Sequence, residues 1–191
     1  MRRIVECSTC GNHHAVYSVT SFCPVCGPGP ATDKILEAIS GAREALAVED
    51  RLGEDKRQTL RAAGGFERFG VDAIESTASL FEMFARGQFT RRVADAQTPT
   101  AGKGNISQRL DDTAQLFADH AGIDVVELAG AERWSRLKLA FARRNVLTHN
   151  GGIIDQKFLD RVPDSSMRLG QRLVVRRADA VQALVRAVDA G

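Results

Sequence analysis

Apolar residues recur every three or four positions over much of this chain, the spacing of one face of an α-helix. The pattern is clearest at residues 134–148, where Trp134, Leu137 and Phe141 follow one another at this spacing. The same reasoning predicts further helices at residues 33–48, 71–86, 107–120, 155–161 and 178–188. Gly151 and Gly152 follow the helix at residues 134–148 and predict its end. The chain is therefore expected to be mainly α.

Two short stretches, at residues 15–20 and 172–175, have the β-branched composition of strands. Connecting segments are expected at residues 27–30, 98–105 and 124–129. The first of these reads Gly-Pro-Gly-Pro and breaks the chain most sharply. We therefore expect a small N-terminal module at residues 1–30 and an α-helical domain at residues 31–191.

The N-terminal module carries two Cys-x-x-Cys pairs, formed by Cys7 with Cys10 and by Cys23 with Cys26. Two thiolates from one tight turn can reach the same ion, and the glycine after each pair lets backbone N–H groups curl towards the sulfurs. Four thiolates from two such turns suit tetrahedral Zn²⁺, so the module resembles a zinc ribbon. We expect structural zinc here. Iron in a rubredoxin-like site is the alternative, and a pair of disulfides is less favoured.

The simplest role for such a metal is to let roughly thirty residues fold without a core of their own. A docking surface for nucleic acid or protein is the sharper alternative, and the sequence leaves it open. His13 and His14 lie between the pairs, but four thiolates already fill the coordination shell, so both are expected at the surface. Four thiolates also leave no open position for catalysis, which disfavours a zinc-dependent enzyme.

Composition and charge narrow the class of protein. Of 191 residues, 43% are hydrophobic and 26% charged, which is ordinary for a globular domain. The sequence has neither an apolar run of ~20 residues nor the apolar stretch of a signal peptide, so we expect a cytoplasmic protein with no membrane partner. In a reducing compartment, cysteines favour metal binding over disulfides.

The net charge is only +2, but it is unevenly distributed. Residues 131–177 hold eleven Lys or Arg against four Asp or Glu, a local charge of +7. This basic half of the helical domain is either an ordinary solvated surface or a binding surface for a polyanion such as RNA.

The most distinctive stretch, residues 140–154, lies in the basic half and reads AFARRNVLTHNGGII. At about 100° per residue, Asn145 and His149 share one helical face, whereas Arg144 lies roughly 140° from His149. One regular helix therefore does not direct Arg144 and His149 at one small target. Either the last turn unwinds at the two glycines, or a second copy of the helix supplies the missing group.

Arg144-Asn145-Val-Leu-Thr-His149 is an Arg-x4-His motif with a polar residue directly after the arginine, and Gly-Gly-Ile-Ile-Asp follows it. At the end of a helix in an all-helical chain, this stretch resembles the signature of the HEPN superfamily. The resemblance covers residues 32–191 in fold and a dozen residues in detail. It implies a metal-independent endoribonuclease of toxin or anti-phage type, acting as a homodimer in which the Arg and His of two protomers form one composite site.

The resemblance also leaves room for a neutralising or activating protein partner. HEPN toxins that are paired with nucleotidyltransferase antitoxins usually carry a tyrosine two residues after the histidine, where they are modified. This chain has Gly151 at that position, so the resemblance does not imply control by that modification.

The residue types suit RNA cleavage. An imidazole can move the proton of the 2′-hydroxyl or of the leaving 5′-oxygen, and a guanidinium can hold the phosphate. We therefore expect His149 as acid or base, Arg144 as phosphate clamp and Asn145 as an orienting hydrogen bonder. Arg143 and Lys138 are expected to contact RNA.

A structural explanation competes with this one. Arg144 could form a surface ion pair, and His149 could interact with the helix dipole. The corresponding functional alternative is a non-catalytic dimeric module that binds nucleic acid or protein.

Overall fold

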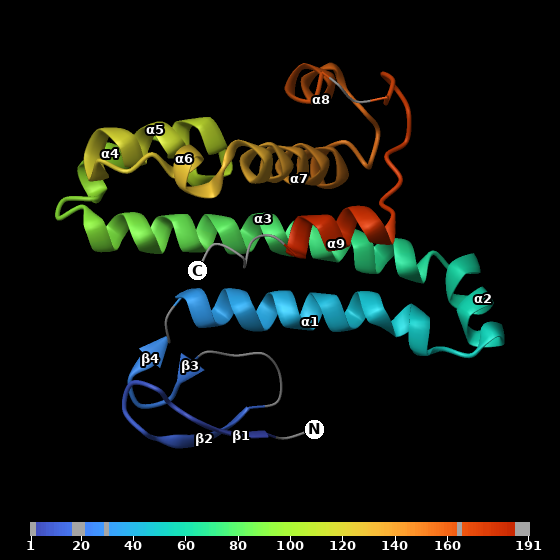
Figure 1. Ribbon diagram of the computed structural model, residues 1–191, viewed down its shortest axis with the longest axis horizontal. Helices are drawn as coiled ribbons and strands as arrows, with labels where there is room; N and C mark the ends of the chain where they lie inside the picture. The colour runs from blue at the N-terminus through green and yellow to red at the C-terminus, as the bar shows by residue number, and fades with distance from the viewer. Residues whose placement is uncertain (1–2, 17–21, 29–30, 164–165, 186–191) are drawn as a thin grey trace.

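The computed structural model describes residues 3–16, 22–28, 31–163 and 166–185 (Figure 1). Within this part of the chain, all strands lie before residue 29 and all helices lie after residue 30. The fold is therefore mainly α with a small N-terminal β element, as the sequence predicts.

The β element consists of two antiparallel hairpins. Strand β1 (Arg3–Glu6) pairs with β2 (His13–Val16), and β3 (Phe22–Cys23) pairs with β4 (Gly27–Pro28). The strand expected at residues 15–20 corresponds to β2, which begins two residues earlier, while residues 17–20 lie outside the described residues. Strand β1 was not expected, because four residues are too few for a pattern of alternation to stand out.

The described helices are α1 (Ala31–Arg51), α2 (Glu54–Ala62), α3 (Gly65–Arg92), α4 (Gln97–Thr100), α5 (Leu110–Ala121), α6 (Val125–Ala129), α7 (Ala131–His149), α8 (Gln156–Arg161) and α9 (Arg177–Val185), with a 3-10 turn η1 (Ile106–Gln108). The six predicted helices correspond to α1, α3, α5, α7, α8 and α9. The connectors expected at residues 98–105 and 124–129 differ from the prediction, because α4 overlaps the first and α6 fills most of the second. Helix α6 forms because the Asp124 side chain accepts the N–H groups of Val126 and Glu127.

Helix α3 runs through the middle of the molecule, with α1 along one side and α5 and α7 along the other (Figure 1). It contributes to three apolar clusters in succession. Ala73 and Ile74 pack with α1 and α9, Ala78 packs with α5 and α7, and Phe89 packs with α5 and η1. Phe89 is the most buried phenylalanine of α3, with 3% of its surface exposed.

Aromatic contacts join α3 to α7. The ring of Phe81 packs edge-on against Trp134 at 6.3 Å and against Phe141 at 5.7 Å between ring centroids. Such edge-to-face pairs contribute about 0.5–1.5 kcal/mol each beyond the area that they bury. They fix α7, the helix that carries the Arg-x4-His motif, against the central helix.

Ion pairs hold α9 in place from two sides. Arg177 at the start of α9 forms a two-pronged contact with Asp50 of α1, with one N–O distance of 2.6 Å. Asp179 accepts a hydrogen bond of 3.0 Å from Arg143 of α7. Helix α9 therefore bridges α1 and α7 across the beginning of α3. Residues 186–188, which were expected to end this helix, lie outside the described residues.

Helix α3 begins at Gly65, six residues before the predicted start at residue 71. The early turns hold Gly70, and an added Cβ there would lie 2.8 Å from Cγ1 of Val175. Val175 and Leu173 belong to the stretch predicted as a strand, which forms one isolated bridge, between Arg172 and Ile153. Val175 packs with Ile74 of α3, and Leu173 packs with Ala142 and Val146 of α7, so this segment packs against helices instead of joining a sheet. Glycine at residue 70 allows that close approach.

We predict that Gly70→Ala destabilises the fold by about 1 kcal/mol, although alanine is the better helix former. Overpacking against the stiff Val175 side chain costs about 1–3 kcal/mol, which exceeds the gain of about 1 kcal/mol in helix propensity. Urea unfolding of the single variants and of Gly70→Ala/Val175→Ala measures the coupling, and the double variant should lose less than the sum. Gly53→Ala, at a position open to solvent, is the control and should change stability by under about 0.5 kcal/mol. A stabilised Gly70→Ala protein would contradict the prediction.

Candidate functional site

The four cysteines come together at the tips of the two hairpins. Cys7 and Cys10 lie in the turn between β1 and β2, and Cys23 and Cys26 flank the turn between β3 and β4. The glycines that follow the two pairs, Gly11 and Gly27, have φ angles of 69° and 83°. These left-handed conformations curl each turn around its sulfurs, as the sequence predicts for such turns.

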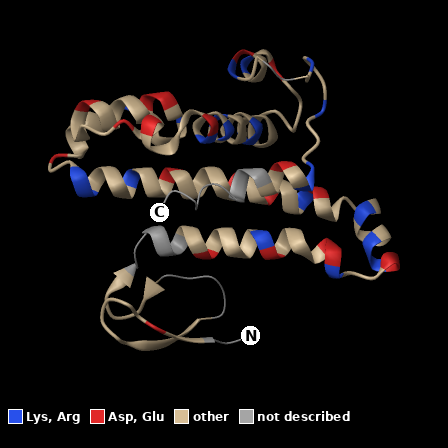
Figure 2. Ribbon diagram, in the orientation of Figure 1, with Lys and Arg blue, Asp and Glu red and all other residues tan. Residues whose placement is uncertain are grey.

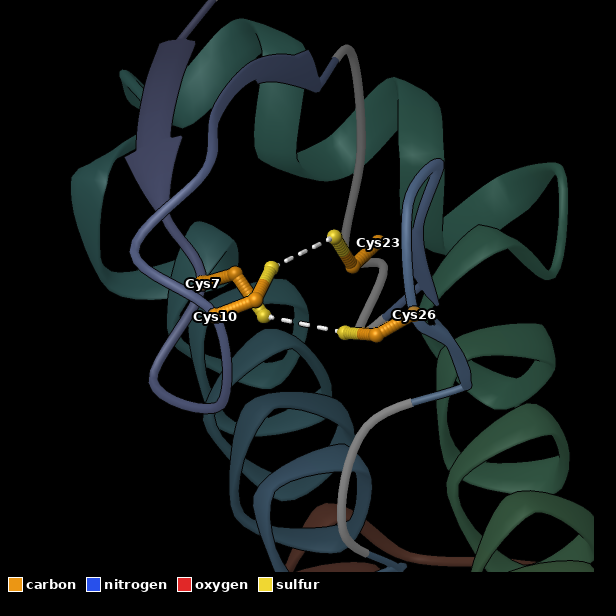
Figure 3. A group of neighbouring side chains, drawn as sticks. All are labelled: Cys7, Cys10, Cys23 and Cys26. Atoms are coloured by element: carbon orange, nitrogen blue, oxygen red, sulfur yellow. Dashed lines mark hydrogen bonds between the residues drawn. The ribbon is translucent and has the colours of Figure 1, made fainter.

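All four sulfurs lie within 4.8 Å of one another and point to one centre (Figure 3). The Sγ atoms of Cys7 and Cys26 are 3.5 Å apart, and those of Cys10 and Cys23 are 3.7 Å apart. Metal–sulfur bonds of about 2.3 Å in a tetrahedron place sulfurs roughly 3.8 Å apart, whereas a disulfide needs about 2.05 Å. The cluster therefore fits one tetrahedral metal ion and is not a pair of disulfides.

Local hydrogen bonds lower the pKa of the Cys7 and Cys23 thiols and so favour their thiolate forms. The backbone N–H groups of Thr9 and Cys10 lower the pKa of the Cys7 thiol to about 6. The neighbouring thiols Cys7 and Cys23 raise the pKa of Cys26 to about 12, because the four sulfurs share protons. A metal ion would displace those protons and draw all four groups to the thiolate form.

The nearby histidines have other partners. Nε2 of His13 lies 3.7 Å from the Glu6 carboxylate across the hairpin, and Nδ1 of His14 lies 3.4 Å from the Asn12 carbonyl. The candidate metal ligands in the described residues are therefore the four cysteines alone, as expected.

We predict one metal ion per chain, lost on Cys23→Ala but kept on Ser8→Ala, which changes the same region without removing a ligand. Elemental analysis and the thiolate-to-metal absorption of the Co²⁺-loaded protein measure this. Loss of a ligand should weaken affinity by more than the roughly 100-fold that loss of an outer-shell partner costs. The far-UV circular dichroism of the helices should persist, because the apolar clusters found in the described residues contain no residue before Ile35. Full metal occupancy in Cys23→Ala would contradict the site.

The second candidate site lies at the end of α7. The helix stays regular up to His149, and the N–H groups of Asn150 and Gly152 both donate to the Val146 carbonyl at 3.0 Å. Gly151 and Gly152, with φ angles of 57° and 82°, turn the chain away immediately afterwards. The glycines therefore end the helix without unwinding its last turn. Of the two explanations that the sequence allows, the structure therefore excludes unwinding of the last turn and leaves a second copy of the helix.

A hollow of about 300 Å³ lies between the end of α7 and α8. Asn145 and His149, one turn apart, line its α7 side, and Lys157 and Arg161, also one turn apart, line its α8 side. In Figure 2 the ribbon of the segment that joins α8 to α9 also carries blue Lys and Arg positions. The hollow therefore combines an imidazole and an amide with two cationic side chains.

Helix α8 is held in position by a buried anchor and a cap. Phe158 is 1% exposed and packs against Ala142 and Val146 of α7. The Asp155 carboxylate accepts the Phe158 N–H at 2.8 Å and the Asn150 side-chain amide at 2.7 Å. This carboxylate ties the end of α7 to the start of α8, so the two walls of the hollow are fixed to each other.

Arg144 lies beside the hollow but does not line it. Its Nη1 atom is 3.5 Å from Oδ1 of Asn145, which does line it. No carboxylate among the described residues lies within ion-pair distance of Arg144, so the surface ion pair considered as an alternative has no partner there. The structure thus brings Asn145 and His149 together and leaves Arg144 at the edge.

The two residues expected to contact RNA lie elsewhere. Arg143 points towards α9, where its side chain is 13% exposed and pairs with Asp179. Lys138, in the middle of α7, pairs with Asp111 of α5 at 2.6 Å. Neither lines the hollow, and their contact with RNA stays a prediction.

Lys157 and Arg161 were not singled out from the sequence. The available signal was their spacing of four residues on a short helix directly after the motif, which places both on one face. Another hollow, of about 320 Å³, runs along α2 beside Leu52 and Leu60, but it holds neither a histidine nor an arginine.

Comparison of the chain with protein-family models, with curated proteins and with solved structures gives no match. Among the described residues, no helix combines the length and the apolar composition that a membrane span needs.

The cap at Asp155 makes α8 sensitive to acid. The Phe158 N–H and then the Asn150 amide hold the pKa of Asp155 below its usual range, and the charge of Lys157 adds to this. A carboxyl whose pKa is lowered in the folded state stabilises the fold at pH values above its unfolded pKa of about 3.9. This stabilisation is lost as the pH falls through the lower pKa of the folded state.

We therefore predict that Asp155→Ala is less stable than the wild type at pH 7 and that the difference narrows below about pH 4. Thermal unfolding across pH 2–8 measures it. Asp160→Ala, on the same helix but away from the cap, should show a smaller and flatter difference. A gap for Asp155→Ala that stays constant from pH 7 to pH 2 would show that the charge of the cap does not act as described.

Proposed function

We propose that the chain is a metal-independent endoribonuclease whose site lies at the end of α7 and includes Arg144, Asn145 and His149. The observation that supports it best is the hollow beside α7, where Asn145 and His149 of the motif face a basic helix. Helix α7 also ends at the motif histidine, as in the HEPN signature that the stretch resembles. The absence of a described ion pair for Arg144 leaves its guanidinium available for a phosphate.

The chemistry needs only groups that RNA and this site provide. His149 takes the proton of the 2′-hydroxyl, and the 2′-oxygen forms a bond to phosphorus while the bond to the 5′-oxygen breaks. Arg144 stabilises the charge that builds up on the phosphate oxygens. An imidazolium at the same composite site protonates the leaving 5′-oxygen. The products are a 2′,3′-cyclic phosphate and a 5′-hydroxyl.

The proposed active form is a homodimer. A helix that is regular up to His149 keeps the side chains of Arg144 and His149 roughly 140° apart. Two copies related by a two-fold axis can bring the arginine of one chain to the histidine of the other. The regular end of α7 thus favours a site that is completed by a second copy.

The ribbon has a structural role in this proposal. Zinc is the proposed metal, because it prefers four thiolates in a tetrahedron, and iron is the alternative that elemental analysis separates. The proposed site of action is the cytoplasm, because a reducing compartment keeps the metal-binding thiols free of disulfides and the proposed substrate is RNA. A protein partner that neutralises or activates the enzyme fits the toxin or anti-phage role.

We predict that the purified protein cleaves single-stranded RNA in the presence of EDTA and that His149→Ala lowers kcat by about 100-fold or more, the scale of general acid–base catalysis. Gel analysis of a labelled RNA and detection of cyclic-phosphate ends measure the reaction. His120→Ala is the matched control, because His120 is also exposed in the last turn of a helix. Equal cleavage by the wild type and His149→Ala would reject the site.

The composite site can be tested by mixing the two inactive variants, Arg144→Ala and His149→Ala. In a mixed dimer, one intact arginine and one intact histidine come from different chains and meet across the axis. Random exchange should restore activity above that of either variant alone and up to about a quarter of the wild-type rate, because half of the dimers are mixed and each keeps one of two Arg–His pairs but only one of the two histidines. No recovery after verified exchange would place both groups in one chain. A dimer that binds RNA without cleaving it would favour the non-catalytic binding module.

A further inference from the structure

The basic residues of α8 form a defined pair in the hollow. Lys157 and Arg161 are one turn apart, and both line the hollow opposite Asn145 and His149. Phe158, between them in sequence, is buried against α7, so α8 cannot roll without exposing its anchor. The two cationic side chains are therefore presented at a fixed place beside the histidine.

The acidic residues nearby offset these charges only in part. Asp155 also lines the hollow, but its carboxylate already accepts hydrogen bonds from Phe158 N–H and from the Asn150 amide. Asp160 hydrogen-bonds to Gln156 one turn away, and neither of these two residues lines the hollow. Among the described residues, Lys157 and Arg161 form no ion pair with a carboxylate. The accessible charge on the α8 wall is thus positive.

The size of the hollow limits what can enter it. A volume of about 300 Å³ is at the lower end of the range for ligand sites, roughly 300–1,000 Å³. A sugar with its phosphate fits this scale, whereas the stacked, two-stranded body of an A-form duplex does not. A single strand can bend one phosphate towards the two cations and leave its bases outside.

We propose that Lys157 and Arg161 grip one backbone phosphate of single-stranded RNA, so that α8 determines which 2′-hydroxyl faces His149. This inference rests on the proposed function for its choice of RNA as ligand, but it concerns binding and does not require cleavage. The amide of Asn145 supplies a neutral contact on the opposite wall. Double-stranded RNA is excluded because its backbone cannot follow the bend into the hollow.

The test uses a fluorescent single-stranded RNA in which every 2′-hydroxyl is methylated, so that it binds but cannot be cleaved. Binding to the full-length protein is measured by anisotropy over a range of salt concentrations for Lys157→Gln, Arg161→Gln and the double variant. Lys103→Gln and Arg91→Gln are the matched controls, because they make the same changes at exposed positions on other elements. Circular dichroism and thermal unfolding check that each variant is folded.

We expect the double variant to bind about 10-fold or more weakly and to lose roughly 0.7 from the slope of log K against log salt, the value for one phosphate contact to a single strand. Each control should stay within about two-fold of the wild type. A duplex of the same sequence should bind the wild type more weakly than the single strand does. With cleavable RNA, the double variant should raise KM far more than it lowers kcat.

Failure of this inference differs from failure of the proposed function. Weakened binding in the double variant, with no cleavage by the wild type, would support phosphate binding by Lys157 and Arg161 and contradict the ribonuclease. Cleavage by the wild type, with binding and KM unchanged in the double variant, would support the ribonuclease and contradict phosphate binding by these two residues. A wild-type protein that binds none of the single strands, or binds the duplex more tightly, overturns the inference outright.

Discussion

The packing of Phe81 between Trp134 and Phe141 is the contact on which the rest of the structure depends. It joins α3, which runs through the middle of the fold, to α7, which carries the candidate site. Helix α3 shares the same continuous side-chain packing with α1, α5 and α9, so α7 is fixed against the whole helical body. Because interiors are close-packed, moving α7 would disturb several clusters at once.

A second, smaller set of contacts fixes the walls of the hollow relative to α7. Val146 of α7 accepts the N–H groups that end the helix, and Phe158 packs beneath it. The Asp155 carboxylate then joins the end of α7 to the start of α8. His149, Lys157 and Arg161 are exposed, but the helices that carry them are held by buried groups. This arrangement of polar side chains on fixed elements suits a binding or catalytic site.

Local patterns predicted the elements better than they predicted contacts between them. Apolar spacing located α1, α5 and α7, and the Cys-x-x-Cys pairs located the thiolate cluster, because in each case the signal lies within a few neighbouring residues. The early start of α3 was missed because Gly70 discourages a helix locally, and its use depends on Val175, a hundred residues away. Lys157 and Arg161 were missed because only the docking of Phe158 turns them towards His149. Arg143 and Arg144 are adjacent in sequence, and only α9 distinguishes the one that pairs with Asp179.

The regular end of α7 is also the strongest physical reason to expect completion of the site from outside the chain. Unwinding the last turn to bring Arg144 towards His149 would break the hydrogen bonds from Asn150 and Gly152 to Val146. It would also shift the Phe158 anchor, leaving polar backbone groups without partners beside a buried ring. In the proposed homodimer, a second copy brings an arginine to the histidine without breaking any of these bonds. Its cost is the entropy of association, which apolar residues exposed beside α7, such as Ile153 and Val174, can offset when they are buried.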